Sequence, residues 1–211
     1  MDEETLRKVK SDLCMILTRI DALRFGSFKL ASGNLSPYYV DLRLVPSYPG
    51  AFEKIVDLYV MMAREMVGVD VFDRVAGIPT AGIPFSSVLS FQLRKPFLYL
   101  RKTEKDHGTG KRIEGLLLPG DRVLLVDDLV TTGQSLSDST EKLRAEGAVV
   151  KDVLVLIDRE EGGIRNLAKK DVTVHALLKI SEAAQILFNV GRIDERDRDA
   201  ILKQIKTSPT H

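Results

Sequence analysis

Residues 123–135 read Val-Leu-Leu-Val-Asp-Asp-Leu-Val-Thr-Thr-Gly-Gln-Ser. The first four residues form a continuous apolar run, which predicts a short strand buried on both faces. The small polar residues that follow lead into a predicted helix from about Ser135 to Glu146, which Gly147 closes. A buried strand, a polar loop and a helix in this order are typical of a parallel sheet that binds ligands where its strands end.

Short strands and helices alternate on both sides of this stretch. We expect strands at 74–78, 96–100, 149–157 and 172–178, and helices at 49–67, 82–93 and 164–170. Before them, apolar spacing predicts a helix over about the first 25 residues, ending near Gly26, and a strand from Ser36 to Leu44. The pattern predicts an α/β fold with a mostly parallel central sheet flanked by helices, and 1–211 as one domain.

Composition narrows the class of protein. Hydrophobic residues make up 44% of the chain, which is typical of a globular protein. The formal net charge is only +1, so the chain has no overall electrostatic field that would attract nucleic acid. No apolar run approaches the roughly 20 residues that cross a bilayer, and the first ten residues are charged, unlike a signal peptide. We therefore expect a cytoplasmic protein without a membrane or nucleic-acid partner. The single cysteine, Cys14, is expected to pack on a helix face and has no assigned catalytic role.

The polar residues of the central stretch suit a sugar phosphate. Ionised Asp127 and Asp128 only accept hydrogen bonds, which fits the two hydroxyls of a ribose. The loop offers main-chain amides and hydroxyls at a helix N-terminus, which fits a phosphate monoester; its residues are Thr131, Thr132, Gly133, Gln134 and Ser135. Alternatively, the acidic pair merely ends a strand and the loop merely caps a helix. No Gly-x-x-x-x-Gly-Lys-Ser/Thr motif occurs, which excludes a P-loop NTPase.

The order of strand, acidic pair, hydroxylated glycine loop and helix resembles the type I phosphoribosyltransferases. Within them, the run Tyr-Leu-Arg-Lys-Thr-Glu-Lys-Asp-His-Gly at 99–108 resembles the catalytic loop of the orotate phosphoribosyltransferases. Such a loop would close over the site. It would also neutralise a departing diphosphate through four residues: Arg101, Lys102, Lys105 and His107. With its glycines and charges, the whole segment 101–115 is expected to be exposed and mobile; alternatively it is only a solvated charged loop.

Two further segments resemble parts of the same family. Residues 25–43 are similar to the segment that covers the orotate ring, which implies roles for Tyr38 and Tyr39. The family commonly has a lysine where this chain has Ala31, and Lys29, two residues earlier on the same strand face, is proposed to replace it; alternatively it is a surface lysine.

The turn at 77–84 resembles the family's diphosphate-binding turn, which implies main-chain contacts at Thr80, Ala81 and Gly82. Ala81 stands where many relatives place a lysine. The resemblance also implies that Arg159, after a buried strand, binds a pyrimidine carbonyl, although Arg159 and Asp158 could instead pair with each other. We interpret His175, in a predicted strand, as structural.

The resemblance implies a type I phosphoribosyltransferase fold, with a core at about 50–180 and a hood formed by about 1–45 and the C-terminal helices. It implies transfer of phosphoribosyl from phosphoribosyl pyrophosphate to orotate, with Mg²⁺ carried mainly by the substrate rather than by a protein metal site. It also implies a homodimer in which the loop 101–115 serves the neighbouring subunit, and no decarboxylase domain is expected. The alternatives are a regulatory, nucleic-acid-binding protein on the same fold and a purine phosphoribosyltransferase.

Overall fold

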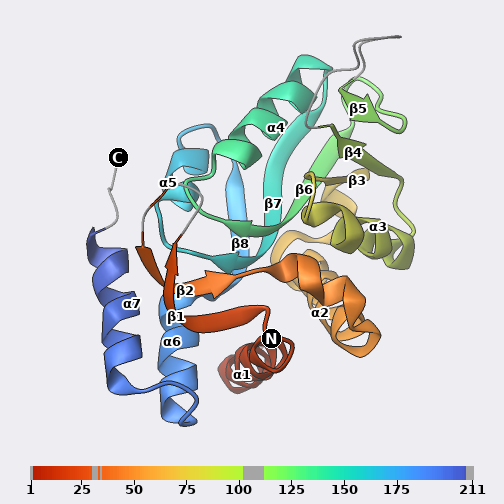
Figure 1. The fold of residues 1–211 in the computed structure, drawn as a ribbon. Helices are drawn as coiled ribbons and strands as arrows, with labels where there is room; N and C mark the ends of the chain where they lie inside the picture. The colour runs from red at the N-terminus through yellow and green to blue at the C-terminus, as the bar shows by residue number, and fades with distance from the viewer. Residues whose placement is uncertain (1, 30–32, 34, 102–111, 208–211) are drawn as a thin grey trace.

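The structure is a computed structural model that describes residues 2–29, 33, 35–101 and 112–207. Its centre is a six-stranded sheet in the order β5-β4-β3-β6-β7-β8 (Figure 1). The strands are β3 (Arg74–Gly77), β4 (Phe97–Leu100), β5 (Ile113–Glu114), β6 (Arg122–Val130), β7 (Val149–Asp158) and β8 (Thr173–Lys179). All neighbours are parallel except β4 and β5. The prediction of a mostly parallel α/β sheet is confirmed.

Helices cover both faces of this sheet, because each buried strand sends alternate side chains to opposite sides. Leu124 and Val126 of β6 pack in the cluster that holds α2 (Pro49–Met62) and α3 (Gly82–Leu93). Leu125 packs in the opposite cluster, with α4 (Gln134–Ala145) and α5 (Gly163–Ala168). A continuous apolar run is therefore needed in β6, as the sequence predicted.

A second layer lies beside the sheet. Strands β1 (Leu23–Lys29) and β2 (Leu35–Val40) pair antiparallel, and α1 (Glu3–Arg19), α6 (Ile180–Asn189) and α7 (Glu195–Thr207) gather around them (Figure 1). Lys10 of α1 pairs with Glu182 of α6 at 2.7 Å, and the Ser36 hydroxyl of β2 donates to Gln204 of α7 at 3.2 Å. The two ends of the chain thus hold the β1–β2 hairpin between them.

Several predicted boundaries were wrong. The first helix ends at Arg19 rather than near Gly26, because Asp21 adopts a left-handed conformation and the chain then turns into β1. The strand expected to reach Leu44 ends at Val40, where the Asp41 side chain caps a 3₁₀ helix, Leu42–Ser47. Strand β6 continues through the acidic pair to Val130, and the short strand β5 within 101–115 was not predicted.

The predicted helix at 49–67 has the right extent, although its last turn, Ala63–Val67, is a π-helix. A 3₁₀ turn, Val69–Val71, then leads to β3. Within the part of the chain that the structure describes, no helix combines the length and the apolar character needed to cross a membrane.

Candidate active site

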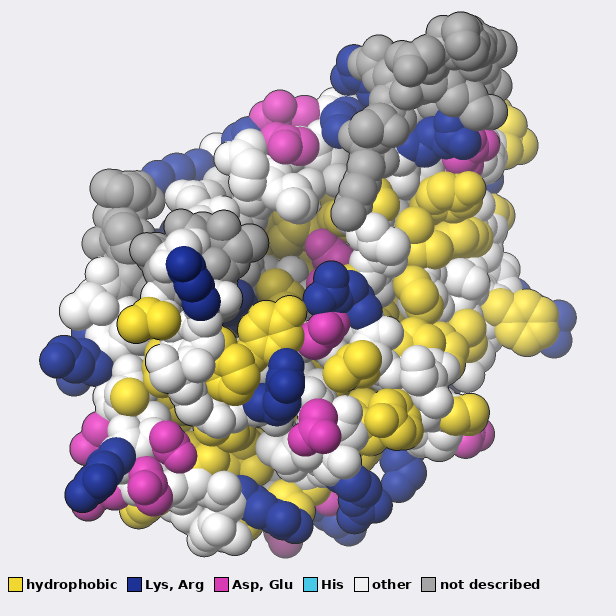
Figure 2. Space-filling model, in the orientation of Figure 1, with side chains coloured by type: hydrophobic (Ala, Val, Ile, Leu, Met, Phe, Trp, Pro, Cys, Tyr) yellow, Lys and Arg dark blue, Asp and Glu magenta, His cyan; other side chains and the backbone are white. Residues whose placement is uncertain are grey.

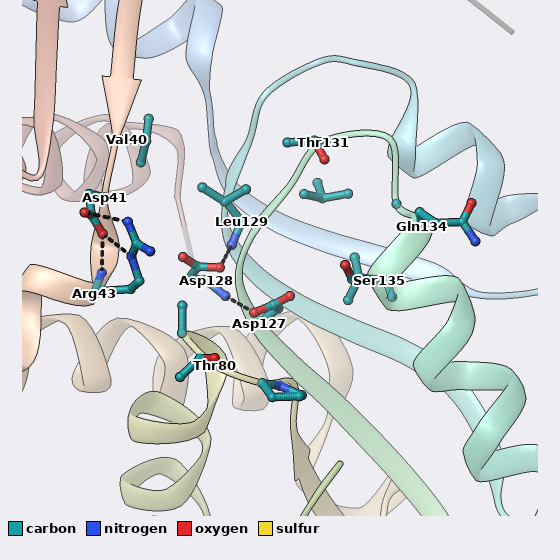
Figure 3. A pocket seen from close by; sticks show the side chains of 15 residues that line it. Val40, Asp41, Arg43, Thr80, Asp127, Asp128, Leu129, Thr131, Gln134 and Ser135 are labelled. Carbon is teal, nitrogen blue, oxygen red and sulfur yellow. Dashed lines mark hydrogen bonds and ion pairs between the residues drawn. The ribbon is translucent and has the colours of Figure 1, made fainter. Parts of the chain in front are cut away.

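The site lies where the chain reverses its direction of travel across the sheet. From β3 the chain moves outward to β4, and it returns to β6 on the other side of β3. The carboxyl ends of β3 and β6 therefore diverge into loops on opposite sides, which is where open α/β sheets bind ligands. A pocket of about 320 Å³ opens at this point (Figure 3). Its walls come from β2 and the turn after it, the turn after β3, the end of β6 and the start of α4.

The acidic pair forms the floor of the pocket. Asp127 is only 8% exposed, and its carboxylate accepts from the Asp128 main-chain N–H at 2.9 Å. The Asp128 carboxylate accepts from the Leu129 N–H at 2.9 Å (Figure 3), and the buried Tyr59 hydroxyl donates to the Asp127 carbonyl at 2.7 Å. Burial raises the pKa of both carboxyls, and the nearby Asp128 charge raises that of Asp127 further, to well above its ordinary value. A ligand that donates hydrogen bonds or brings a cation would relieve this cost.

The loop after β6 places main-chain amides at the N-terminus of α4. Thr131, Gly133, Gln134 and Ser135 line the pocket, whereas Thr132 is exposed and is not among the lining residues. Gly133 has φ +81°, a conformation that favours glycine. A side chain there would also meet the Gly163 carbonyl at 3.0 Å. The loop is therefore fixed by a close approach to the start of α5.

Gly163 was not identified from the sequence, although the loop depends on it. Its N–H donates to the Thr131 carbonyl at 2.9 Å, and a Cβ at this position would lie 2.4 Å from the same oxygen. The Asn166 side chain donates to the Thr132 carbonyl at 3.0 Å. A Gly-Gly pair after a strand gives only a weak turn signal, so nothing in the sequence ties it to a loop thirty residues earlier.

The turn after β3 forms the opposite wall. Pro79, Thr80 and Ala81 line the pocket, and Gly82, the first residue of α3, is buried beneath it. A Cβ on Gly82 would lie 2.6 Å from the Val126 carbonyl, so only glycine lets α3 begin this close to β6. Gly82 therefore packs the turn against the acidic strand and is not itself a lining residue.

Arg159 lies beside the pocket and is held by two neighbours. Its Nε donates to the Tyr38 hydroxyl at 3.1 Å, and its Cζ is 5.1 Å from the Tyr38 ring centroid. Its Nη2 forms an ion pair with Glu161 at 2.9 Å. The alternative pairing of Arg159 with Asp158 was wrong, because the ion-pair partner of Arg159 is Glu161 and the Asp158 carboxylate accepts from the Glu160 N–H. Burial raises the pKa of the Tyr38 hydroxyl. Sequence reasoning missed Glu161, which follows the strand without any recognisable motif.

The remaining predicted residues are more scattered. Lys29 is exposed at the end of β1, and Ala31 lies outside the described residues. The Tyr39 ring packs near Phe28, with a centroid distance of 5.8 Å.

Of the predicted catalytic loop, Arg101 pairs with Glu114 of β5 at 2.7 Å. Three residues of the predicted catalytic loop also lie outside the described residues: Lys102, Lys105 and His107.

Two residues without an assigned chemical role occupy structural positions. His175 of β8 pairs with Asp152 of the neighbouring strand β7 at 2.8 Å, although its direct partner in the register is Leu154. Cys14 is fully buried in the core, and burial raises the pKa of its thiol to about 12. A thiol with so high a pKa is a poor nucleophile, in agreement with the packing role predicted for it.

Two charged residues of the pocket were not predicted. Asp41 and Arg43 line it next to the acidic pair, and both belong to the turn that follows β2 (Figure 3). Their order, Asp-x-Arg after an apolar alternation, was interpreted as the continuation of a strand. The charged residues Asp41 and Arg43 could have indicated that the strand ends there and that a turn follows.

Comparisons with known proteins agree with this geometry. Residues 69–185 match the model of the phosphoribosyl transferase domain. The chain is 42% identical over 172 residues to orotate phosphoribosyltransferase from Cenarchaeum symbiosum, covering 82% of this chain and 86% of that protein. It superposes on the crystal structure of orotate phosphoribosyltransferase from Aeropyrum pernix with a TM-score of 0.75 and 33% identity, covering 86% and 99% of the two chains.

Its similarity to the structure of Leishmania donovani UMP synthase, with a TM-score of 0.82 and 30% identity, covers 93% of this chain but only 42% of that one. The matched part of that longer chain has the same fold. The pocket at the reversal between β3 and β6 and the similarity over most of the chain lead to one conclusion: this protein is a member of the orotate phosphoribosyltransferase family, with the type I phosphoribosyltransferase fold.

Proposed function

We propose that this protein transfers phosphoribosyl from phosphoribosyl pyrophosphate to orotate, giving orotidine monophosphate and diphosphate, as a cytoplasmic enzyme of pyrimidine biosynthesis in which residues 1–211 form one domain. The observation that supports it most is the composition of one pocket. A loop at a helix N-terminus, the acidic pair of buried Asp127 and partly buried Asp128, and the turn after β3 all line the same 320 Å³ cavity, which suits a sugar that carries phosphate at both ends.

In this proposal the 5-phosphate binds the amides and hydroxyls of 131–135, and the ribose hydroxyls donate to Asp127 and Asp128. The diphosphate lies at the turn of Thr80 and Ala81.

Orotate binds beside β2, with Arg159 donating to a pyrimidine carbonyl. The hydrogen bond from Nε to the Tyr38 hydroxyl and the ion pair with Glu161 support this last assignment, because together they set the direction of the guanidinium.

The reaction is a displacement at the anomeric carbon. The deprotonated ring nitrogen of orotate forms a bond to this carbon, and the bond to the diphosphate oxygen breaks, with its electron pair leaving on the diphosphate. Positive charge develops on the ribose and negative charge on the leaving group. We assign Arg101, Lys102, Lys105 and His107 to the leaving group, where cations stabilise the transition state more than the ground state.

The described residues fit a role for Mg²⁺. Two adjacent carboxylates, Asp127 and Asp128, line the pocket, and Mg²⁺ is commonly bound by one or two carboxylates together with substrate phosphates. No group of three or more His, Cys, Asp or Glu side chains within the described ranges could hold a metal ion, so substrate oxygens and water would complete its shell. The ion would neutralise charge on the diphosphate.

A side-by-side assay with three bases tests the proposed function. Purified protein, phosphoribosyl pyrophosphate and Mg²⁺ are mixed with orotate, uracil or adenine, and the base and its nucleotide are separated and quantified. We expect orotate to be consumed, with a stoichiometric release of diphosphate, and the other two bases to remain. Consumption of adenine would support a purine enzyme, and no consumption of any base would support the regulatory alternative.

We also propose a two-fold dimer in which each 101–115 segment serves the neighbouring site. Lys105→Ala and Asp127→Ala chains should each be nearly inactive alone. In an equal mixture with free exchange, half of the dimers are hybrids, and each hybrid has one site with neither lesion. Activity should then recover to about a quarter of the wild-type value, the ceiling set by two-fold symmetry.

The hybrids are isolated with two different affinity tags, so that their formation is verified before activity is measured. If the segment serves its own subunit, every site in a hybrid keeps one lesion. Verified hybrids without activity above that of the separate variants would therefore contradict the shared site, and the assignment of the reaction would stand.

A further inference from the structure

The charges in the pocket are unbalanced for an anionic substrate. Three of the lining residues are acidic: Asp41, Asp127 and Asp128. Among the described residues that line the pocket, Arg43 is the only cation. In the space-filling view, acidic and basic side chains meet at the hollowed centre of the face shown (Figure 2). The acidic side chains would repel a ligand that carries two or more phosphate charges. The position of Arg43 therefore decides which part of such a ligand is attracted to the pocket.

The guanidinium of Arg43 is held on one edge only. Nε donates to Asp41 Oδ1 at 2.6 Å, and Nη2 donates to Asp41 Oδ2 at 2.8 Å (Figure 3). Nη2 also lies 3.4 Å from the Tyr39 hydroxyl. No described residue accepts a hydrogen bond from Nη1. Since Asp41 also caps the 3₁₀ helix that carries Arg43, the guanidinium is fixed before any ligand binds.

We propose that Arg43, positioned by Asp41, binds the diphosphate group of phosphoribosyl pyrophosphate. Figure 3 shows Arg43 on the far side of Asp128 from Gln134 and Ser135. With the 5-phosphate at Gln134 and Ser135 and the ribose on the acidic pair, the anion that faces Arg43 is the one on the anomeric carbon. This inference rests on the proposed function, because it takes its orientation from the assigned substrate.

The simpler role for Arg43 is a surface ion pair with Asp41, and the chain contains a matched example. Arg122 forms the same fork with Asp73, through Nε at 2.9 Å and Nη2 at 2.7 Å, and its main-chain N–H also donates to that carboxylate. The Arg122 and Arg43 side chains are 47% and 62% exposed. Arg122 begins β6, at the end of the sheet away from the pocket. It therefore controls for the loss of an exposed fork without the loss of a pocket cation.

The test compares Arg43→Gln with Arg122→Gln in the full-length protein. Binding of diphosphate with Mg²⁺ is measured by calorimetry, and the Michaelis constants of both substrates are measured separately. For Arg43→Gln we expect diphosphate affinity to fall about tenfold, the loss of one solvent-screened hydrogen bond to a charged group. The Michaelis constant for phosphoribosyl pyrophosphate should rise similarly and that for orotate should stay within roughly twofold. Arg122→Gln should change neither, and both variants should melt at similar temperatures.

The outcomes separate this inference from the proposed function. Unchanged diphosphate affinity in Arg43→Gln, with an active wild-type enzyme, would overturn only the role of Arg43. A rise in the orotate constant alone would also overturn it, since Arg43 would then face the base. If the wild-type protein neither consumes orotate nor binds diphosphate, both the inference and the proposed function fail. Arg43→Lys, which restores the charge without the fork, should recover part of the affinity.

Discussion

Asp127→Asn should stabilise the folded protein near neutral pH and at the same time weaken phosphoribosyl pyrophosphate binding by about 1–3 kcal/mol. The stabilising effect follows from burial, which raises the folded-state pKa of Asp127 above the unfolded value of about 3.9. Between these two pKa values the folded state binds more protons than the unfolded state, so wild-type stability falls as pH rises through this window. Asparagine carries no charge and can still accept from the Asp128 N–H.

Thermal melts without ligand at about pH 7.5 and about pH 4 measure this effect. The gain in melting temperature should be present at the higher pH and should shrink at the lower pH, where the wild-type carboxyl becomes neutral. Asp73→Asn is the control with the opposite sign. Hydrogen bonds from Arg122 hold the pKa of Asp73 below its ordinary value, so this variant should lose stability at neutral pH. A lower melting temperature for Asp127→Asn at neutral pH would contradict the inference that the buried Asp127 charge, kept for ligand binding, lowers the stability of the folded protein.

Arg159→Met should lower the specificity constant for orotate by roughly 100-fold, the order expected for losing hydrogen bonds from a charged group. It should also destabilise the protein by about 1–3 kcal/mol, because Glu161 and the Tyr38 hydroxyl lose their partner while largely enclosed. The Arg159 and Glu161 side chains are only 13% and 23% exposed. The Michaelis constant for phosphoribosyl pyrophosphate should change little.

A second substitution separates recognition from stability. In Arg159→Met with Glu161→Gln no buried charge is left alone, so urea unfolding should show part of the stability restored. Orotate use should stay as low as in the single variant. Recovery of orotate use in the double variant would mean that the single variant failed through misfolding, and Arg159 would lose its assignment to the base.

The central sheet could be predicted from the sequence because its information is local. The apolar run at 123–126, the polar loop and the glycine after α4 each specify their own conformation, and the order of the strands and helices then fixes the class of fold. The same reasoning missed β1, because a helical apolar spacing and a strand alternation overlap near Leu23, and only pairing with β2 decides between them.

The residues of the candidate site also differ in how far local sequence predicts them. Asp127, Asp128 and the loop at 131–135 form one continuous motif, and all of these residues except Thr132 line one pocket. Arg43 and Glu161 belong to no motif. Arg43 reaches the pocket because the turn after β2 folds over the end of β6. Glu161 is recognisable only through its ion pair with Arg159, which Tyr38, more than 100 residues earlier in the chain, places beside the pocket. Such residues become visible only when distant segments are brought together.

The loop at 159–163 does more than connect β7 to α5. Arg159 donates its N–H to the Val130 carbonyl at 3.0 Å, and Gly163, where α5 begins, donates its N–H to the Thr131 carbonyl at 2.9 Å. These two hydrogen bonds connect the loop to the one that follows β6, so we expect a base bound by Arg159 and a phosphate bound at 131–135 to act on one connected unit. Their affinities should then be thermodynamically linked, each ligand improving the binding of the other by the same factor. A nucleotide that carries both groups would contact both loops in one binding event.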